Sequence, residues 1–214
     1  MNTELKNKFD SVIFDLDGTL WDSTANVAKA WQKAKEEVDY VKDDFTQVVI
    51  RSITGMTYKA IFEKLVPYLD EERREEFKSI AAKYELEILH TEGGELYPEL
   101  EATLKYLQPK YKLFIVSNCQ SGYIETFFNV TGFEHYFQGH QCYGTKSQPK
   151  WENIRDIVND HGLNTPVYVG DTQGDHDAAG KAGVPFILAT YGFGKVDGDQ
   201  IANIQQFSDL TNIL

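Results

Sequence analysis

The sequence predicts an α/β protein in which a doubly wound parallel sheet carries an inserted helical subdomain. Short apolar runs at 12–14, 112–117 and 167–171 have the composition of strands that are buried on both faces. Segments with apolar residues at helical spacing separate the later runs, and strands that alternate with helices form parallel sheets. A long block with helical spacing alone stands between the first run and the second, which indicates the insertion.

The inserted block extends from about residue 21 to residue 91, within a chain of 214 residues. Four helices are expected in it: one that Asp22 or Ser23 caps and that runs to Val38, and three at 44–53, 57–68 and 71–90. A chain of this length suits one domain with an insertion. We therefore expect a helical cap domain at 21–91 and a core domain built from 1–20 and 92–214.

The core should bring polar side chains from three strands to one place. Strands are expected at 11–14, 112–117, 141–143, 167–171 and 184–189. Helices are expected at 100–107, 122–130, 152–161 and after Asp171 as far as Ala182. The carboxyl ends of parallel strands lie at one edge of the sheet, where ligands bind. Three apolar runs end in Asp15, Ser117 and Asp171, so we expect these side chains at a single site.

The overall charge limits the class of partner. The net charge is −12 and the isoelectric point is about 4.8. Nucleic acids and anionic membranes would be repelled, so neither is an expected partner. An anionic substrate would need a local positive site. We expect a small molecule as the ligand, and the sequence leaves monomer and dimer both open.

The chain carries no sign of export. No apolar run approaches the roughly 20 residues needed to cross a bilayer, and segment 1–8 lacks the apolar core of a signal peptide. We therefore expect a cytoplasmic protein. Cys119 and Cys142 show neither CxxC nor zinc-site spacing, so we expect them to be reduced and structural.

Two aspartates follow the first strand and suggest a metal site. Asp15 and Asp17 are two residues apart, so in extended chain their side chains point the same way. Like charges this close repel, and a divalent cation keeps both ionised. An EF-hand loop does not fit, because Gly18 is the fourth residue from Asp15 and Asn26 stands at position twelve. The remaining alternative is a simple turn that caps the strand.

Four motifs resemble one known family. They are DLDGT at 15–19, VSN at 116–118, a lysine before a helix, and GDTQGDHDAA at 170–179. Together they resemble the motifs of the haloacid dehalogenase superfamily, which has a Rossmann-like core, and the helical insert resembles its phosphoglycolate phosphatase and β-phosphoglucomutase branch. Dehalogenases of the superfamily usually lack the second aspartate, so Asp17 favours phosphoryl chemistry. The resemblance implies an Mg²⁺-dependent phosphatase that acts on small phosphorylated metabolites, such as phosphoglycolate-like monoesters.

The resemblance also assigns roles to the carboxylates. Asp15 would attack phosphorus and form an aspartyl phosphate, while Asp17 would protonate the leaving oxygen and then take a proton from water. Mg²⁺ would be held by Asp15, the backbone carbonyl of Asp17 and Asp171. Asp175, one turn into the next helix, adds a further oxygen ligand of the kind that Mg²⁺ prefers.

The phosphoryl oxygens need donors of their own. Ser117 and the backbone amides near Gly18 and Asn118 would hold them, and Thr19 is assigned to the same phosphate-binding group. The lysine of the third motif is Lys146 or Lys150; Lys150 is preferred because it directly precedes a helix.

Four positions near the motifs have more than one interpretation. His176 is expected on a helix surface and Asp177 in solvent. Trp21 either lines a substrate cleft or packs beneath the cap. The segment 191–194 either borders the site or turns the chain.

Two other functions use similar residues. A sugar phosphomutase of the β-phosphoglucomutase type would use the same groups and return the phosphoryl group to a sugar. A phospho-accepting receiver domain also uses a strand-end aspartate, magnesium and a lysine, but it needs neither Asp17 nor a helical cap.

Overall fold

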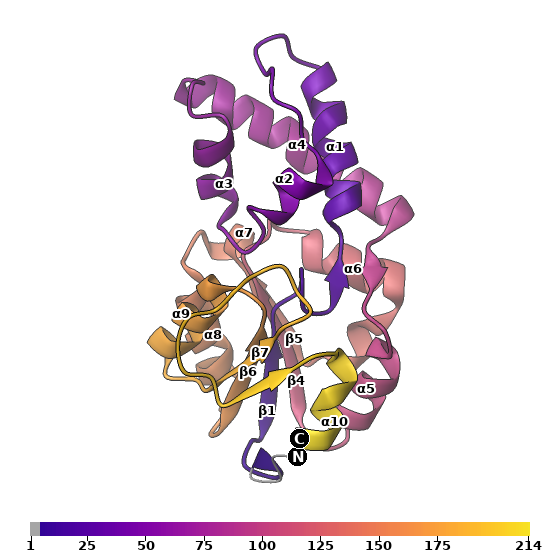
Figure 1. Cartoon of the computed structure of the whole chain (residues 1–214), viewed down its shortest axis with the longest axis vertical. Coiled ribbons are helices and arrows are strands. Elements are labelled where there is room, and N and C mark those ends of the chain that lie inside the picture. Colours follow the sequence, from indigo (N-terminus) through magenta and orange to yellow (C-terminus); the bar gives the residue numbers. More distant parts are fainter. Residues whose placement is uncertain (1–4) are drawn as a thin grey trace.

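The computed structural model describes residues 5–214, and its central element is a parallel sheet of six strands (Figure 1). Its strands are β1 (Ser11–Phe14), β4 (Lys112–Ser117), β5 (Gly139–Cys142), β6 (Pro166–Gly170), β7 (Phe186–Ala189) and β8 (Ala202–Ile204). The spatial order is β5-β4-β1-β6-β7-β8, and every pairing is parallel. β1 lies between β4 and β6, with Phe14 opposite Ile115 and Val169. The carboxyl ends of β1, β4 and β6 therefore share one edge.

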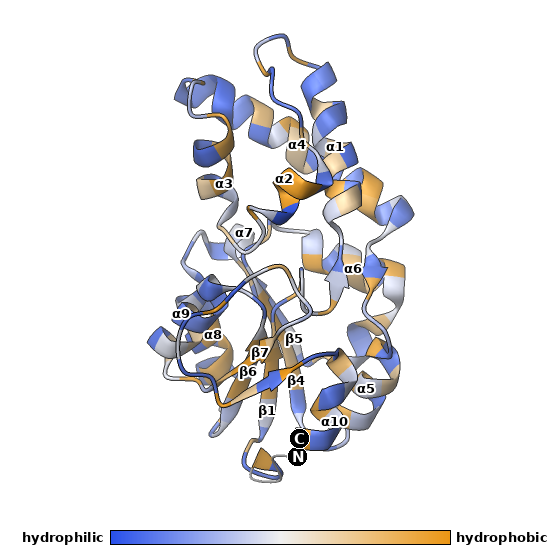
Figure 2. Cartoon of the chain, viewed as in Figure 1, coloured by the Kyte–Doolittle hydropathy of each residue, from blue (hydrophilic) through white to orange (hydrophobic). Residues whose placement is uncertain are grey.

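Helices cover both faces of this sheet, as a doubly wound fold requires. One face is covered by α5 (Leu100–Leu107), α6 (Tyr123–Thr131) and α10 (Leu210–Ile213), and the other by α8 (Lys150–Asp160) and α9 (Gln173–Ala182). Successive β1 side chains alternate between two hydrophobic clusters: Val12 and Phe14 belong to one, and Ile13 to the other. All three are fully buried, and Figure 2 shows the sheet as largely apolar beneath helices with hydrophilic outer faces.

Four helices between β2 and β3 stand over the carboxyl edge of the sheet (Figure 1). They are α1 (Thr24–Glu36), α2 (Gln47–Arg51), α3 (Tyr58–Leu65) and α4 (Glu71–Glu92). Their core is aromatic: Trp31 stacks on Phe62 with ring centroids 4.7 Å apart, and Phe45 stacks on Phe77 at 5.6 Å. The helices are joined to the sheet by an antiparallel pair of two-residue strands, β2 (Trp21–Asp22) and β3 (Glu95–Leu96).

The expected α/β fold is confirmed, and several element bounds differ from the prediction. The helix expected at 44–53 is shorter, because Thr46 is extended and its hydroxyl accepts from the Val49 N–H. Ser23 is the N-cap residue of the first helix, but its hydroxyl donates to Asp17 and makes no capping bond; Asp22 Oδ1 accepts from the Thr24 N–H at 2.9 Å instead. Tyr143, expected in a strand, begins the short helix α7 (Tyr143–Lys146).

The sheet also contains a strand that the sequence did not indicate. β8 is three residues long and pairs with β7, so its run of apolar residues is too short to detect. Short 3₁₀ helices at Phe133–Tyr136 and Phe207–Asp209 complete the described elements. Within residues 5–214 no helix is long and apolar enough to cross a membrane.

Candidate active site

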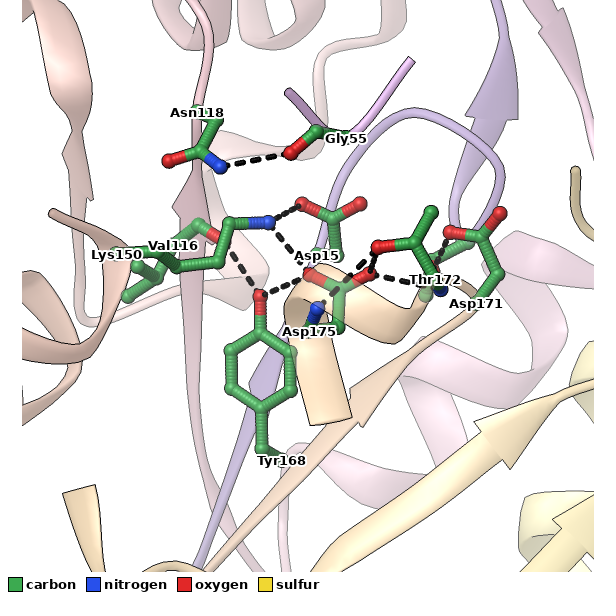
Figure 3. Close-up of polar contacts among 10 residues, drawn as sticks. Asp15, Gly55, Val116, Asn118, Lys150, Tyr168, Asp171, Thr172 and Asp175 are labelled. Carbon is green, nitrogen blue, oxygen red and sulfur yellow. Dashed lines mark hydrogen bonds and ion pairs between the residues drawn. The ribbon is translucent and has the colours of Figure 1, made fainter. Parts of the chain in front are cut away.

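Three carboxylates meet where β1 and β6 end (Figure 3). Asp15 follows β1, Asp171 follows β6, and Asp175 lies in the first turn of α9. One oxygen of each lies within 4.8 Å of the others, and all three residues are buried. Neighbouring parallel strands bring Asp15 and Asp171 together although 156 positions separate them in the chain.

Lys150 supplies the positive charge at this cluster. It is the first residue of α8, is 4% exposed, and its Nζ lies 2.7 Å from Asp15 Oδ1 and 2.6 Å from Asp175 Oδ1. Lys146, the other lysine considered for this position, pairs with Asp156 at the surface. Of the two lysines, the structure therefore places Lys150 at the carboxylates.

Asp175 is held by donors on both oxygens. Its Oδ2 accepts from the Thr172 N–H at 3.0 Å and from the Thr172 hydroxyl at 2.6 Å. The Thr172 Oγ1 accepts in turn from the Asp175 N–H at 3.2 Å, and the two bonds between backbone N–H and side chain form a capping box at the start of α9. Asp175 Oδ1 accepts from Lys150 and from the Tyr168 hydroxyl at 3.3 Å. Each oxygen thus has two donors, so Asp175 is better placed to orient Lys150 than to bind a metal directly.

Negative charge exceeds positive charge at this site. Burial and the nearby Asp175 raise the pKa of Asp15 to about 7, although Lys150 opposes the shift. Burial and the charges of Asp175 and Asp15 raise the pKa of Asp171 well above its usual value. Burial alone would lower the pKa of Lys150, but the charges of Asp15 and Asp175 raise it well above normal. One lysine among three carboxylates leaves a site whose charge a divalent cation would balance.

The backbone closes tightly around Asp171. A Cβ at Gly18, where φ is +88°, would lie 2.3 Å from Asp171 Oδ2. A Cβ at Gly192 would lie 2.3 Å from the Cβ of Asp171. The Phe193 N–H donates to Asp171 Oδ2 at 2.7 Å. The segment 191–194 therefore borders the site, which answers a question that the sequence left open.

Asp17 lines the same cavity as Asp15, but its side chain has hydrogen-bond partners of its own. Its Oδ1 accepts from the Trp21 indole at 2.9 Å, the Ser23 hydroxyl at 2.6 Å and the Tyr123 hydroxyl at 3.0 Å. Burial raises the pKa of Asp17 to about 6, although these hydrogen bonds lower it. Its side chain is not part of the three-carboxylate cluster. Trp21 is fully buried and packs on Phe127, with ring centroids 5.1 Å apart, so it positions Asp17 from beneath and does not line the cavity.

Two of the expected phosphate ligands are placed differently. The Gly18 N–H donates to the Trp21 carbonyl at 2.9 Å and is therefore not free for a phosphate. Thr19 is fully buried, and its hydroxyl donates to Asp171 Oδ1 at 3.4 Å. Its side chain therefore helps to position that carboxylate. Both groups thus have partners within the chain, and phosphate binding at Gly18, at Thr19 and by the amides near Gly18 stays a prediction from the sequence.

Ser117 and Asn118, by contrast, line the cavity above Asp15. The cavity has a volume of about 70 Å³ and lies between the sheet edge and the four helices. The Asn118 amide donates to the Gly55 carbonyl at 2.8 Å, which links the end of β4 to the loop between α2 and α3 (Figure 3). His176 and Asp177 lie on the outer side of α9, partly or fully exposed, as expected. Cys119 and Cys142 are both free thiols.

The comparisons with known proteins point to one family. The profile of the haloacid dehalogenase-like hydrolases matches residues 12–189. This chain belongs to that family. A relative from Aquifex aeolicus named phosphoglycolate phosphatase is 30% identical over 215 aligned positions that cover 95% of each chain. A relative of the same name from Aliivibrio fischeri is 28% identical and covers 91% of this chain and 88% of its own.

Solved structures agree on the fold of this hydrolase. A predicted phosphoglycolate phosphatase from Haemophilus somnus superposes with a TM-score of 0.83 at 24% identity, over 97% of this chain and 99% of its own. A haloacid dehalogenase-like hydrolase from Streptococcus pneumoniae gives 0.82 at 21% identity, over 96% and 98%. This chain therefore shares its Rossmann-like α/β core with these two structures.

Several residues that shape the hydrolase site were not apparent from the sequence. They are Ser23, Tyr123, Tyr168, Thr172, Tyr58, Glu85 and Gln120. Each acts by a contact with a residue from another element or from the next turn, and only Thr172 lies within one of the four motifs. The one available signal was Thr172-x-x-Asp175, which has the spacing of a capping box.

Proposed function

We propose that this hydrolase is an Mg²⁺-dependent phosphatase that acts on small phosphate monoesters through an aspartyl-phosphate intermediate. The observation that carries the proposal is the buried pair of Asp15 and Lys150 at the floor of a cavity that Asp17 also lines. A carboxylate nucleophile, a fixed cation and a second carboxyl group are the parts that phosphoryl transfer through a covalent intermediate needs. The names of the relatives from Aquifex and Aliivibrio support the same class of reaction.

Asp15 and Asp17 would divide the work between them. Asp15 is the proposed nucleophile, because it lies at the end of β1 and is aligned by Lys150. Asp17 is the proposed acid and base, because its raised pKa lets it hold a proton near neutral pH. Three donors fix its Oδ1, and no donor among residues 5–214 contacts Oδ2, so that oxygen is available to the leaving group.

The donor set fits Mg²⁺. Asp15 and Asp171, together with the backbone carbonyl of Asp17, would hold the ion, while Asp175 would act through Lys150 and through water. Bound there, the ion would offset the repulsion between the carboxylate nucleophile and the phosphate dianion. Ser117 and Lys150 would hold the phosphoryl oxygens, since both line the cavity beside Asp15.

The helices at residues 21–91 would serve as a cap domain over the core of 1–20 and 92–214. Support comes from the two-residue strands β2 and β3, which connect them to the sheet, and from the Asn118 to Gly55 hydrogen bond that spans the cavity. A closed cap would exclude stray water and limit access to small esters. A cytoplasmic location, the absence of nucleic-acid partners and a monomeric or dimeric state remain predictions from the sequence.

The intermediate can be trapped by removing Asp17. In Asp17→Asn, an aryl phosphate with a good leaving group can still phosphorylate Asp15, but hydrolysis lacks its base. We expect the intact protein to gain the mass of one phosphoryl group while steady turnover falls by about 10²-fold or more. Asp177→Asn, an exposed position on α9, is the matched control and should turn over normally.

A double variant tests whether the trapped phosphoryl group is bound to Asp15. Asp15→Asn combined with Asp17→Asn should gain no phosphoryl mass, because the amide is not a nucleophile. Phosphorylation that persists without Asp15, or an Asp17→Asn enzyme with unchanged turnover, would contradict the proposal. Many turnovers of substrate by the unmodified protein would also exclude a receiver domain, which reacts at most once.

A further inference from the structure

The part of the cavity that faces the leaving group is mostly apolar. Side chains from the helices and loops of the cap form it, namely Val27, Trp31, Ile50, Ile53, Met56 and Ile61. The phosphoryl group would lie at the opposite end, beside Asp15 and Lys150. Whatever alcohol leaves from the phosphate must therefore fit an apolar enclosure of limited size.

One polar cluster interrupts this apolar wall. Glu85 of α4 is 5% exposed, and its Oε2 accepts from the Tyr58 hydroxyl at 2.9 Å and from the Gln120 amide at 2.7 Å. No donor of ordinary geometry among residues 5–214 reaches Oε1. Burial raises the pKa of Glu85 to about 8, so the carboxyl group is mainly uncharged at pH 7. It can accept a hydrogen bond from a ligand or donate one.

A second unused polar atom lies in the same wall. The indole N–H of Trp31 is buried and has no hydrogen-bond partner of standard geometry in the described chain. It nevertheless lies close enough to Glu85 to help lower the pKa of that group. A buried donor without a partner is costly, so an oxygen of the ligand would be a suitable acceptor for it.

The wall offers no counterion to an acidic leaving group. The ionisable carboxyl groups that line the cavity are Asp15, Asp17 and Glu85. Lys150 is the one lysine or arginine among the lining residues, and it is already paired with Asp15 and Asp175. Arg51, which lies on α2, is paired with Asp22 outside this lining.

We propose that this pocket selects an uncharged leaving group: a compact alcohol with an apolar body and a hydroxyl that can bond to Glu85 and Trp31. A second acidic group would meet a mostly apolar wall, and Lys150, the one lining cation, is already paired with Asp15 and Asp175. The proposal rests on the phosphatase function proposed above and narrows its substrates. It disfavours phosphoglycolate, which carries a carboxylate, and it disfavours a sugar bisphosphate, which a phosphomutase must bind.

Two esters of nearly equal size test this selection. 2-Hydroxyethyl phosphate and 2-phosphoglycolate differ mainly in whether a hydroxyl or a carboxylate ends the leaving group. We expect kcat/KM at pH 7 with Mg²⁺ to be at least about tenfold higher for the hydroxyethyl ester, since an unpaired charge in such a site is strongly unfavourable. Equal efficiency, or a preference for phosphoglycolate, would overturn the proposal.

A single cation added to the cavity wall should weaken the preference for the hydroxyethyl ester over phosphoglycolate. Met56 lines the cavity and is only partly buried, so Met56→Lys can place an ammonium at the wall without a large packing change. The ratio of kcat/KM for phosphoglycolate to that for the hydroxyethyl ester should rise by about tenfold. Met56→Gln has nearly the same size without the charge and should leave the ratio unchanged. A ratio that rises equally in both variants would contradict a charge-based selection.

p-Nitrophenyl phosphate separates this inference from the function on which it rests. Hydrolysis of that ester together with a preference for phosphoglycolate would leave the phosphatase proposal standing and reject the selection. Failure to hydrolyse any of the three esters would reject both. Circular dichroism and the melting temperature of each Met56 variant confirm that the comparison concerns folded enzymes.

Discussion

Lys150 balances more buried negative charge than any other side chain at the site. Its removal should therefore lower the free energy of unfolding as well as the catalytic activity. Lys150→Met keeps much of the side-chain volume and removes the ammonium. Asp15 and Asp175, which it contacts at 2.7 and 2.6 Å, would then remain buried beside Asp171 without a cation. Breaking a buried ion pair by removing one partner costs about 3–5 kcal/mol.

Lys146→Met is the matched control for this change. Lys146 belongs to the same segment and also forms an ion pair, but its side chain is 39% exposed and its partner Asp156 is 32% exposed. Exposed pairs contribute about 0–1 kcal/mol. Urea unfolding at pH 8 in EDTA should therefore separate the two variants by about 2–5 kcal/mol, which is the difference between the two ranges.

The stability difference between Lys150→Met and the wild type should also depend on pH. Asp15 and Asp171 have raised pKa values, and an acid with a raised native pKa contributes stability that is lost as pH rises through that value. Without Lys150 the pKa values of Asp15 and Asp171 should rise further. The loss in the free energy of unfolding of Lys150→Met should therefore shrink as pH falls from 8 to 5. A loss in the free energy of unfolding below about 1 kcal/mol at pH 8, or one that grows on acidification, would refute a stabilising role for the Lys150 charge.

Three further outcomes are expected. EDTA should abolish turnover and Mg²⁺ should restore it, whereas Ca²⁺ should not, because its larger and less directional coordination misplaces the attacking carboxylate; equal rates with both ions would count against this geometry. Glu85→Gln should match the wild type in stability near pH 4 and exceed it by up to about 5 kcal/mol at pH 9 in urea unfolding, since the pKa of Glu85 is raised to about 8 and its ionisation is lost in the variant. Replacing residues 26–90 by a Gly/Ser linker should lower kcat/KM for small esters by about 10²-fold or more, and a folded capless core with unchanged efficiency would argue against a cap.

The sheet and the carboxylate cluster could be predicted because local sequence determines them. Apolar runs that end in Asp15, Ser117 and Asp171 already indicate both the strands and their common edge. β8 could not be found in this way, because its three residues acquire their pairing from β7.

The environment of each site residue was harder to predict because it depends on tertiary contacts. Tyr123 contacts Asp17 from 106 residues away, and Gln120 contacts Glu85 from 35 residues away. No periodicity or spacing links such pairs. The same reason explains why the hydrogen bond from the Thr19 hydroxyl to Asp171 was not predicted from the sequence.

The pairing of β2 with β3 has a consequence for how the chain can fold and change. Trp21 stands opposite Leu96, so the segment between them leaves the sheet and returns to it at adjacent points. β1 and β4 are neighbours in the sheet although the whole helical segment separates them in sequence. Closing a loop costs free energy that grows only with the logarithm of its length. This segment packs on an aromatic core of its own, and the pairing of β2 with β3 holds its two ends together. For the sheet, the helical segment is therefore equivalent to a short hairpin closed by β2 and β3. Helices of another length or sequence could replace it without altering the register of β1 against β4.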